Sequence, residues 1–331
     1  MGGLYALATV AQSLDTVIGV HRRLGLDGVI ALGSGRADVS GWCDVRAIAQ
    51  PFHLPTIVVR SYDLSDAADL EVLTALDIDV LLSVGWQRVV PSWLLARCRR
   101  GAVGVHGSPW GITRGRGRSP QTWALILGSL RFEVSLFQLT PGVDDGPVLA
   151  SRSFDLTERD DIVTAFKKTS AAAVDMFLEV LCRDELGGVP QRADEARYFP
   201  QRRPQDGGLD WRLSTGDIDR FIRALTRPYP GAFTTLEGSR VTVWRARAFG
   251  QPEGRVPGEV VRTFLDGSFV VRTGDSTLLV EDADTSVPIE EGSVFESVDA
   301  TVQYARIVAR HRARHPDRPI VSEILRRATH Q

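Results

Sequence analysis

Two glycine-rich stretches of the sequence, HGSPWGITRGRGRSP and TPGVDDGPV, carry His106 and Asp144. His106 ends a short apolar run at 102–106, so its imidazole is expected where a buried strand stops. If the second stretch leaves a neighbouring strand, its carboxylate can orient the imidazole and stabilise its charge, as general acid–base catalysis requires. The pair predicts proton-transfer chemistry at the edge of a sheet; an ordinary surface histidine is the alternative.

Several other chemical motifs are absent from the sequence. No GxGxxG fingerprint follows the first expected strand, and GSGR at 33–36 is an isolated glycine pair. There is neither a GxxxxGK[ST] segment to cradle a nucleoside triphosphate nor an HExxH metal motif. Cys43, Cys98 and Cys182 lie far apart and show no metal-ligand spacing. We therefore expect buried, reduced thiols and no metal site.

The elements that must position His106 alternate through the first half of the chain. The expected strands are 4–10, 28–33, 55–59, 78–84 and 102–106, and the expected helices between them are 11–24, 43–51, 65–76 and 91–99. This alternation predicts an α/β fold with a doubly wound, mostly parallel sheet. A ligand site in such a sheet lies at the carboxyl ends of the strands, where the strand order reverses.

Polar residues mark the expected helix starts. Ser65 is expected to cap the third helix, with Asp66 and Asp69 in its first turn, where the helix dipole favours carboxylates. Ser119 and Pro120 are placed to open another helix. That helix, two further strands and a long amphipathic helix are expected at 119–128, 131–139, 147–154 and 157–183.

The pattern changes after residue 190. A helix is expected at 214–226, and strands of β-hairpins at 241–247, 258–265, 268–273 and 276–282. We predict a catalytic α/β domain at 1–190, a linker at 191–210, a smaller β-barrel-like C-terminal domain at 211–295 and a helical tail at 296–331. The tail is basic, and a solvated helix is expected there.

The charge balance excludes some classes of partner. The 39 basic residues, of which only Lys167 and Lys168 are lysines, nearly match the 41 acidic residues, so no basic field gathers nucleic acid or anionic lipid. No apolar run approaches the roughly 18–20 residues of a membrane span, and the N-terminus lacks the features of a signal peptide. A cytoplasmic protein without a membrane partner is predicted.

Four motifs, in order along the chain, resemble the folate-dependent formyltransferases. They are His106-Gly107-Ser108, Arg116-Gly117-Arg118-Ser119-Pro120, Trp123-Ala124-Leu125-Ile126-Leu127-Gly128 and Val143-Asp144-Asp145-Gly146. The segments 83–86, 198–202, 208–211 and 227–233 extend the resemblance, the last three to the second domain of the methionyl-tRNA and sugar N-formyltransferases. The resemblance implies a formyltransferase Rossmann-like fold followed by a small β-barrel-like domain.

The resemblance also implies a reaction: direct transfer of a formyl group from 10-formyltetrahydrofolate to an amine through a tetrahedral intermediate. His106 would stabilise the oxyanion and help to move the amine's proton, and Asp144 would pair with His106. The residues expected to hold the formyl donor and exclude water are Gly85, Trp86, Ser108, Pro109, Trp110, Gly111, Gly142 and Val143.

Two departures from the family pattern bear on this prediction. The family's Asn two residues before the His is Gly104 here, and losing one oxyanion donor typically costs on the order of 10²–10³ in rate. A water, a backbone amide or Ser108 is expected to compensate. A changed reaction, hydrolysis of the formyl donor and a non-catalytic folate-binding protein are the alternatives. The second departure is Pro109-Trp110-Gly111, which replaces Leu-Leu-Pro.

The acceptor is expected to be a small-molecule amine, first of all an amino sugar on a nucleotide carrier. Gly104 is expected beside this acceptor, and the arginines expected to hold a pyrophosphate are Arg116, Arg118, Arg223 and Arg227. A secondary-metabolite amine is an alternative. Transfer RNA is disfavoured because the net charge is −2 and the region after the second strand is nearly neutral. The oligomeric state, a homodimer included, is left open.

Overall fold

The computed structural model describes residues 2–33, 39, 41–250 and 254–329. The chain divides into two compact units. One contains Met1–Arg116, Arg131–Asp155 and Phe166–Ala196, and the other contains Gly117–Leu130, Leu156–Ala165 and Arg197–Gln331. In the described part of the chain, no helix combines the length and the apolar character needed to cross a bilayer.

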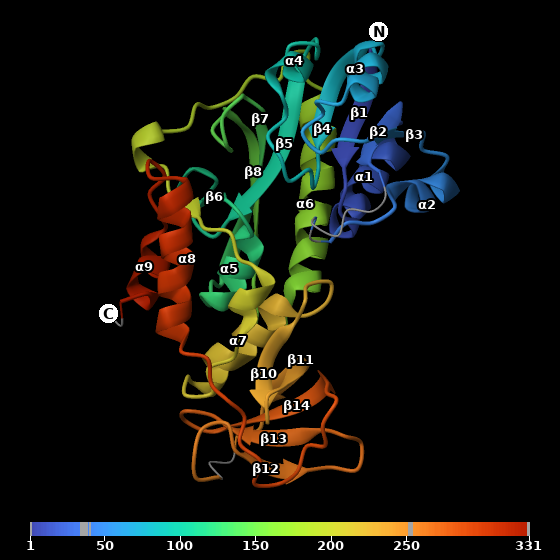
Figure 1. The fold of residues 1–331 in the computed structure, drawn as a ribbon. Coiled ribbons are helices and arrows are strands. Elements are labelled where there is room, and N and C mark those ends of the chain that lie inside the picture. Colours follow the sequence, from blue (N-terminus) through green and yellow to red (C-terminus); the bar gives the residue numbers. More distant parts are fainter. Residues whose placement is uncertain (1, 34–38, 40, 251–253, 330–331) are drawn as a thin grey trace. The chain divides into compact units, whose positions relative to one another are not determined.

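The first unit is built on a seven-stranded sheet. Its strands are β1 (Gly3–Ala8), β2 (Gly28–Leu32), β3 (Thr56–Val59), β4 (Ile78–Ser83), β5 (Gly101–Ser108), β7 (Arg131–Gln138) and β8 (Val148–Asp155). They lie in the order β3-β2-β1-β4-β5-β7-β8 (Figure 1). The first five are parallel, and β7 and β8 run antiparallel to their neighbours. The predicted mostly parallel, doubly wound sheet is confirmed, with its order reversing between β1 and β4.

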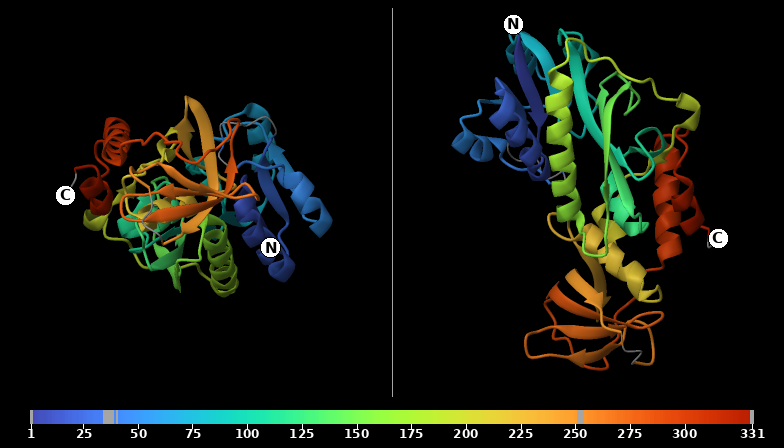
Figure 2. Two further views of the ribbon diagram at one scale, coloured as in Figure 1. Left: turned by 90° about the horizontal axis from the view of Figure 1, so that it is seen from below. Right: turned by 180° about the vertical axis from the view of Figure 1, so that it is seen from behind.

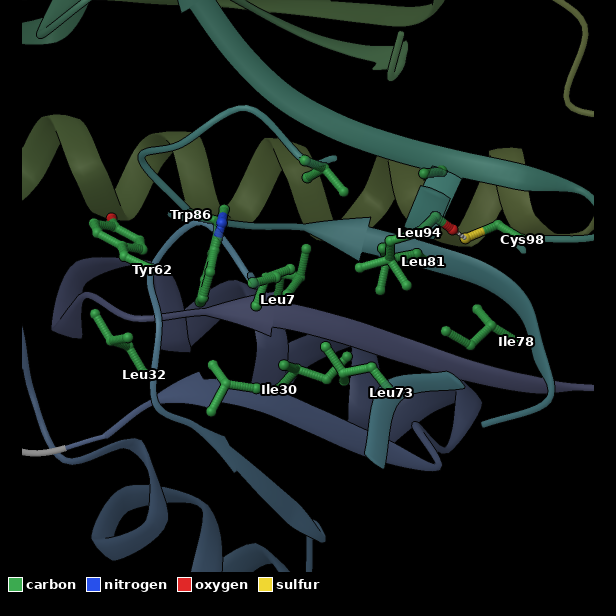
Figure 3. Packing of buried hydrophobic residues seen from close by; sticks show 14 of the residues in the cluster. Leu7, Ile30, Leu32, Tyr62, Leu73, Ile78, Leu81, Trp86, Leu94 and Cys98 are labelled. Atoms are coloured by element: carbon green, nitrogen blue, oxygen red, sulfur yellow. Dashed lines mark hydrogen bonds between the residues drawn. The ribbon is translucent and has the colours of Figure 1, made fainter. Parts of the chain in front are cut away.

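Helices cover both faces of this sheet, because alternate strand residues point to opposite sides. They are α1 (Ala11–Leu24), α2 (Val45–Ala49), α3 (Ala67–Thr74), α4 (Ser92–Leu95) and α6 (Ile162–Leu181). On one face α1 and α6 lie side by side (Figure 2). The Thr16 hydroxyl of α1 donates to Ser170 Oγ of α6 at 2.9 Å. On the other face Leu73 of α3 and Leu94 of α4 join a buried cluster with strand residues such as Leu81 (Figure 3).

The start of α3 differs from the prediction by one residue. Asp66, not Ser65, is the N-cap, and its carboxylate accepts a hydrogen bond from the Ala68 amide at 2.9 Å. The Ser65 hydroxyl instead donates to the Asp63 carboxylate at 2.7 Å. Asp is as good a cap as Ser, so the residue types alone did not distinguish the two positions.

Asp69 also has a role other than the predicted one. Its buried carboxylate accepts from the backbone amides of Arg60 and Ser61 at 2.8 Å each and from the Ser61 hydroxyl at 2.9 Å. Asp69 therefore holds the chain that leaves β3 against α3, beyond any interaction with the helix dipole.

The second unit combines helices with an antiparallel barrel. Its helices are α5 (Pro120–Ile126), α7 (Thr215–Leu225), α8 (Ala300–Arg314) and α9 (Ser322–Arg327). Its strands are β10 (Ala232–Leu236), β11 (Ser239–Ala248), β12 (Val260–Thr263), β13 (Phe269–Arg272) and β14 (Thr277–Asp284), in the order β10-β11-β14-β13-β12. Two further short strands are β6 (Arg116–Gly117) and β9 (Tyr198–Phe199).

The segment 292–296 closes the barrel between its two outer strands. The Val260 amide of β12 donates to the Ser293 carbonyl at 2.8 Å, and the Glu296 amide donates to the Thr235 carbonyl of β10 at 3.0 Å. The predicted β-barrel-like C-terminal fold is confirmed, although β10 was not among the expected strands.

The C-terminal tail is packed, so the expectation of a solvated helix is wrong. The helices α8 and α9 bury the side chains of Tyr304, Ile307 and Ile324. The Tyr304 ring lies 5.9 Å from the ring of Trp123 in α5, measured between centroids. At the start of α5, Ser119 has a φ of 56° and makes no side-chain cap, although Pro120 does occupy the first turn as predicted.

We expect Asp69→Ala to lower the free energy of unfolding by about 2–3 kcal/mol, because the substitution removes a charged acceptor from partly buried amides. Urea denaturation measures this loss. The control Asp66→Ala removes only a helix cap and is expected to cost about 1 kcal/mol. An equal or smaller loss for Asp69→Ala would contradict the role assigned to this carboxylate.

Candidate active site

His106 lies near the carboxyl end of β5, on the same strand face as Gly104 and Ser108. The strand is held by β4 as far as Gly104 and by β7 along its second half. Gly104 pairs with Ser83 of β4, and His106 lies opposite Ser135 of β7. The imidazole side chain is 9% exposed, so only a small part of the ring reaches solvent.

The imidazole of His106 lies between two acceptors. Its Nδ1 is 3.7 Å from Asp144 Oδ2, and its Nε2 is 2.8 Å from the Gly115 carbonyl oxygen. The first distance is a charge contact that is longer than a hydrogen bond, and the second is a hydrogen bond. A neutral ring donates from one nitrogen only, whereas a protonated ring donates from both. Each ring nitrogen thus faces an acceptor, and the catalytic role of the ring stays a prediction.

The loop that carries Asp144 turns back on itself. The Gly142 amide donates to Thr140 Oγ1 at 3.2 Å, and the Thr140 hydroxyl donates to the Asp145 carboxylate. Asp144 has a φ of 51°, in the left-handed region that Asp tolerates better than most residues. The adjacent carboxylates thus have different roles: Asp145 closes the loop and Asp144 faces the imidazole. Val143 beside them is half-buried.

The four residues expected on the donor side after His106 form a tight turn. Ser108 is fully buried, and its Oγ accepts a hydrogen bond from the Trp110 amide at 3.1 Å. Gly111 has a φ of 79°, and Pro109 lies half-buried before Trp110. The Trp110 side chain is 37% exposed. The Ser108 hydroxyl therefore fixes the turn that presents the Trp110 indole.

Gly85 and Trp86 follow the carboxyl end of β4. Gly85 has a φ of 77°, and a Cβ atom there would lie 2.5 Å from Ser13 Cβ, so the position requires glycine. The Trp86 ring packs edge-on against Tyr62 with centroids 4.9 Å apart (Figure 3). Trp86 Nε1 is buried and has no hydrogen-bond partner among the described residues. This N–H is enclosed by the core in the structure, so its contact with a ligand stays a prediction.

Hydrocarbon fills the space beside Gly104. A Cβ atom on Gly104 would lie 2.7 Å from Leu139 Cδ2 and 2.8 Å from Phe137 Cε1. An asparagine at this position therefore requires both side chains to move. The structure accounts for the departure at Gly104: β7 and the residue that follows it occupy the volume that a longer side chain would need.

The four arginines expected at a pyrophosphate are divided between the two units. Arg116 belongs to the first unit, is buried, and donates from Nη2 to Gln191 Oε1 at 2.9 Å. Arg118 belongs to the second unit, as do Arg223 and Arg227. The Arg118 backbone amide donates to the Phe199 carbonyl at 3.1 Å. Arg116 is thus engaged by a side-chain amide.

The other two arginines make ion pairs within the second unit. Arg223 Nε lies 2.8 Å from Asp219 Oδ2, and burial raises the pKa of Asp219 although the guanidinium opposes this change. Arg227 Nη1 lies 2.9 Å from Asp282 Oδ2, and the guanidinium lies 4.1 Å from the centroid of the Trp244 ring. Both guanidinium groups already have acidic partners, and their contact with a substrate stays a prediction.

The cysteines are separated from this arrangement. Burial raises the pKa of both Cys43 and Cys98 to about 11, with the charge of Asp44 adding to the effect at Cys43. Cys182 is exposed, so the expectation that all three thiols are buried is wrong. Within the described ranges, no group of three or more His, Cys, Asp or Glu side chains could hold a metal ion.

Two contacts of the site were missed from the sequence. One is the Gly115 carbonyl that accepts from His106, since no residue pattern marks a backbone acceptor. The other is Gln191, assigned to the linker, whose Nε2 donates to the Asp144 carbonyl at 2.9 Å. The only local signal for Gln191 is its position after a short Gly-Gly-Val-Pro segment.

Family models match most of the chain. "Formyl transferase" matches residues 29–181, and "Formyl transferase, C-terminal domain" matches residues 202–287. The chain belongs to the formyltransferase family. The predicted family is thus confirmed, and the formyltransferase model covers β5 with His106 and the loop with Asp144.

Solved structures share the fold of this chain. HypX from Aquifex aeolicus in complex with tetrahydrofolic acid is 16% identical with a TM-score of 0.62, over 96% of this chain and 58% of that chain. An N-formyltransferase from Helicobacter canadensis is 12% identical with a TM-score of 0.59, over 86% of this chain and 100% of that one. Methionyl-tRNA formyltransferase from Clostridium thermocellum is 16% identical with a TM-score of 0.56, over 88% of this chain and 100% of that one. This chain spans 48–61% of the length of the HypX chains.

We expect Gly104→Asn to lower the free energy of unfolding by about 1–3 kcal/mol, the usual cost of overpacking a core. Adding Leu139→Ala to this variant is expected to recover part of the loss, because it vacates the nearest contact of the new side chain. Thermal and urea unfolding of the two single variants and the double variant measure the coupling. Strictly additive losses would show that Leu139 does not limit the space at Gly104.

Proposed function

We propose that this formyltransferase transfers a formyl group from 10-formyltetrahydrofolate to a primary amine of a small molecule. The observation that carries the proposal is the His106 ring between the Asp144 carboxylate and the Gly115 carbonyl, in a chain of this family. Two proteins of similar fold support the choice of donor, since HypX was solved with tetrahydrofolic acid and the Helicobacter canadensis enzyme with folinic acid.

The residues near the strand ends suit a folate donor. Trp86 has a buried indole N–H that lacks a hydrogen-bond partner among the described residues, and a small movement of the side chains around it would present this donor to an acceptor of the pterin. Trp110 offers a partly exposed aromatic ring on a turn fixed by Ser108. When bound, 10-formyltetrahydrofolate supplies an activated formyl carbon.

His106 is assigned the proton of the reaction. The acceptor amine loses a proton as its nitrogen bonds to the formyl carbon, and the nitrogen released from that carbon gains one. The imidazole can hold this proton between the two events, and the Asp144 carboxylate stabilises the resulting imidazolium. The Gly115 carbonyl keeps the Nε2 side of the ring in a fixed orientation.

The charge of the chain favours a small acceptor over transfer RNA. With a net charge of −2 and only two lysines, the chain lacks the excess of cations on which phosphate-dominated binding depends. A nucleotide-linked amino sugar is the first acceptor to test. The Helicobacter canadensis protein was solved with dTDP-3-aminofucose, and WlaRD is described as a sugar 3N-formyl transferase solved with dTDP.

An acceptor panel tests the proposal. Purified protein is incubated with 10-formyltetrahydrofolate alone, with nucleotide-linked amino sugars, with small primary amines, and with methionyl-tRNA. Formylated product and released tetrahydrofolate are measured together. Formylation of a small amine supports the proposal. Acceptor-independent formate release supports a hydrolase, formylation of methionyl-tRNA alone supports the tRNA enzyme, and folate binding without turnover supports a binding protein.

We expect His106→Ala to lower formyl transfer by about 10²–10⁴-fold, the usual contribution of a positioned acid–base group. Asp144→Ala is expected to be nearly as severe, because it removes the charge that stabilises the imidazolium. Steady-state kinetics measure both effects, and circular dichroism checks that the variants fold. His53→Asn is the matched control, since His53 is exposed and its φ of 55° suits Asn. A His106→Ala rate like that of the unmodified protein would refute the assignment.

A further inference from the structure

The side chain of Gln191 joins two segments that are far apart in the chain. Its Oε1 accepts from Thr113 Oγ1 at 3.0 Å and from Arg116 Nε at 3.2 Å and Nη2 at 2.9 Å. Its Nε2 donates to the carbonyl of Asp144 at 2.9 Å and to that of Gly146 at 2.7 Å. All of these residues belong to the first unit.

These partners fix the orientation of the Gln191 amide. A guanidinium and a hydroxyl meet its oxygen, whereas two backbone carbonyls meet its nitrogen. A flipped amide would place its oxygen against the two carbonyl oxygens and its NH₂ group against the guanidinium. Both N–H donors of the amide are used, so the side chain is held in a single orientation.

The two joined segments each supply one partner of His106. Thr113 and Arg116 flank Gly115, whose carbonyl accepts from His106 Nε2 at 2.8 Å. The Asp144 backbone bonded to Gln191 carries the carboxylate that lies 3.7 Å from His106 Nδ1. The Gln191 amide thus links the two backbone segments that carry the acceptors of His106.

We propose that Gln191 is a positioning residue that holds the Gly115 carbonyl and the Asp144 carboxylate on the two nitrogens of His106. None of the hydrogen bonds that the structure shows for its side chain goes to the imidazole, so its effect is expected to pass through the two partners of His106. Its catalytic consequence rests on the proposed function, whereas its effect on the imidazole does not.

Two substitutions at Gln191 distinguish the role of the amide oxygen from that of the amide nitrogen. Gln191→Ala removes every hydrogen bond of the side-chain amide. Gln191→Glu keeps acceptors for Arg116 and Thr113 but replaces both N–H donors with an oxygen facing the Asp144 and Gly146 carbonyls. Gln191→Glu therefore retains the partner of the buried Arg116 guanidinium and guards against a variant that fails to fold. Gln50→Ala, at an exposed glutamine of the first unit, is the matched control.

The first measurement is nitrogen NMR of the full chain labelled with ¹⁵N-histidine, without folate or amine. Loss of a pair of ring signals in His106→Ala assigns the His106 resonances. We expect these signals to shift in both Gln191 variants and to stay unchanged in Gln50→Ala. His106 signals that are identical in the unmodified protein and in folded Gln191 variants would overturn the proposal.

The second measurement is a double-mutant cycle on formyl transfer. We expect Gln191→Ala to lower kcat by about 10²-fold, the effect of a small misplacement of reacting groups, with little change in the folate KM. In the Asp144→Ala background, Gln191→Ala is expected to lower kcat far less, because the carboxylate that Gln191 positions is already absent. Equal losses in both backgrounds would overturn the positioning role. If no acceptor is formylated by the unmodified protein, the proposed function fails while the NMR result still decides the inference.

Discussion

The arrangement of the site depends on holding one imidazole between two acceptors of different origin. The backbone of His106 is held by its pairing with Ser135 of β7, just beyond the last pair that β5 makes with β4. Its two partners lie on irregular segments, one a backbone carbonyl at Gly115 and the other a carboxylate on a residue with a φ of 51°. Such segments have no ladder of their own, so side chains must fix them. The hydrogen bonds made by Thr140 and Gln191 meet this need.

The extension of β5 beyond the parallel strands explains why His106 and Asp144 meet. The pairing of β5 with β4 ends at Gly104, and the antiparallel strand β7 runs back along β5 from Ser108 to Val103, so the loop that follows β7 begins beside this strand end. The order of the parallel strands reverses nearby, between β1 and β4. The chain leaves β4 through Gly85, whose positive φ and close contact with Ser13 exclude a side chain, and it reaches Trp86 at once. Trp86 thus belongs to the buried cluster beneath the strand ends. Its indole N–H has no hydrogen-bond partner among the described residues. The packing of the core and the chemistry of the edge share this residue.

Much of the fold follows from periodicity, because buried strands and amphipathic helices leave a repeating pattern of apolar residues. The helix α1 has the predicted bounds, and the meeting of His106 with Asp144 follows the expected convergence of two loops. Contacts between a side chain and a distant backbone leave no such pattern. The roles of Asp69 and Gln191 therefore could not be predicted, and neither could the burial of the tail, whose apolar positions are few among many arginines.

Gly104 shows how packing and chemistry constrain each other at this strand end. Phe137 and Leu139 approach so closely that a side chain at position 104 displaces them, so the core of the sheet extends to the position two residues before His106. Under the proposed function, an amide donor at this position is replaced by hydrocarbon, and a missing oxyanion donor typically costs on the order of 10²–10³ in rate. The remaining stabilisation then depends on the imidazolium of His106 and on backbone amides. A site with fewer hydrogen-bond donors to the oxyanion is more sensitive to the placement of each donor. Under the proposed function, the two acceptors that orient His106 therefore contribute more to the rate here than they would in a site that also has an asparagine.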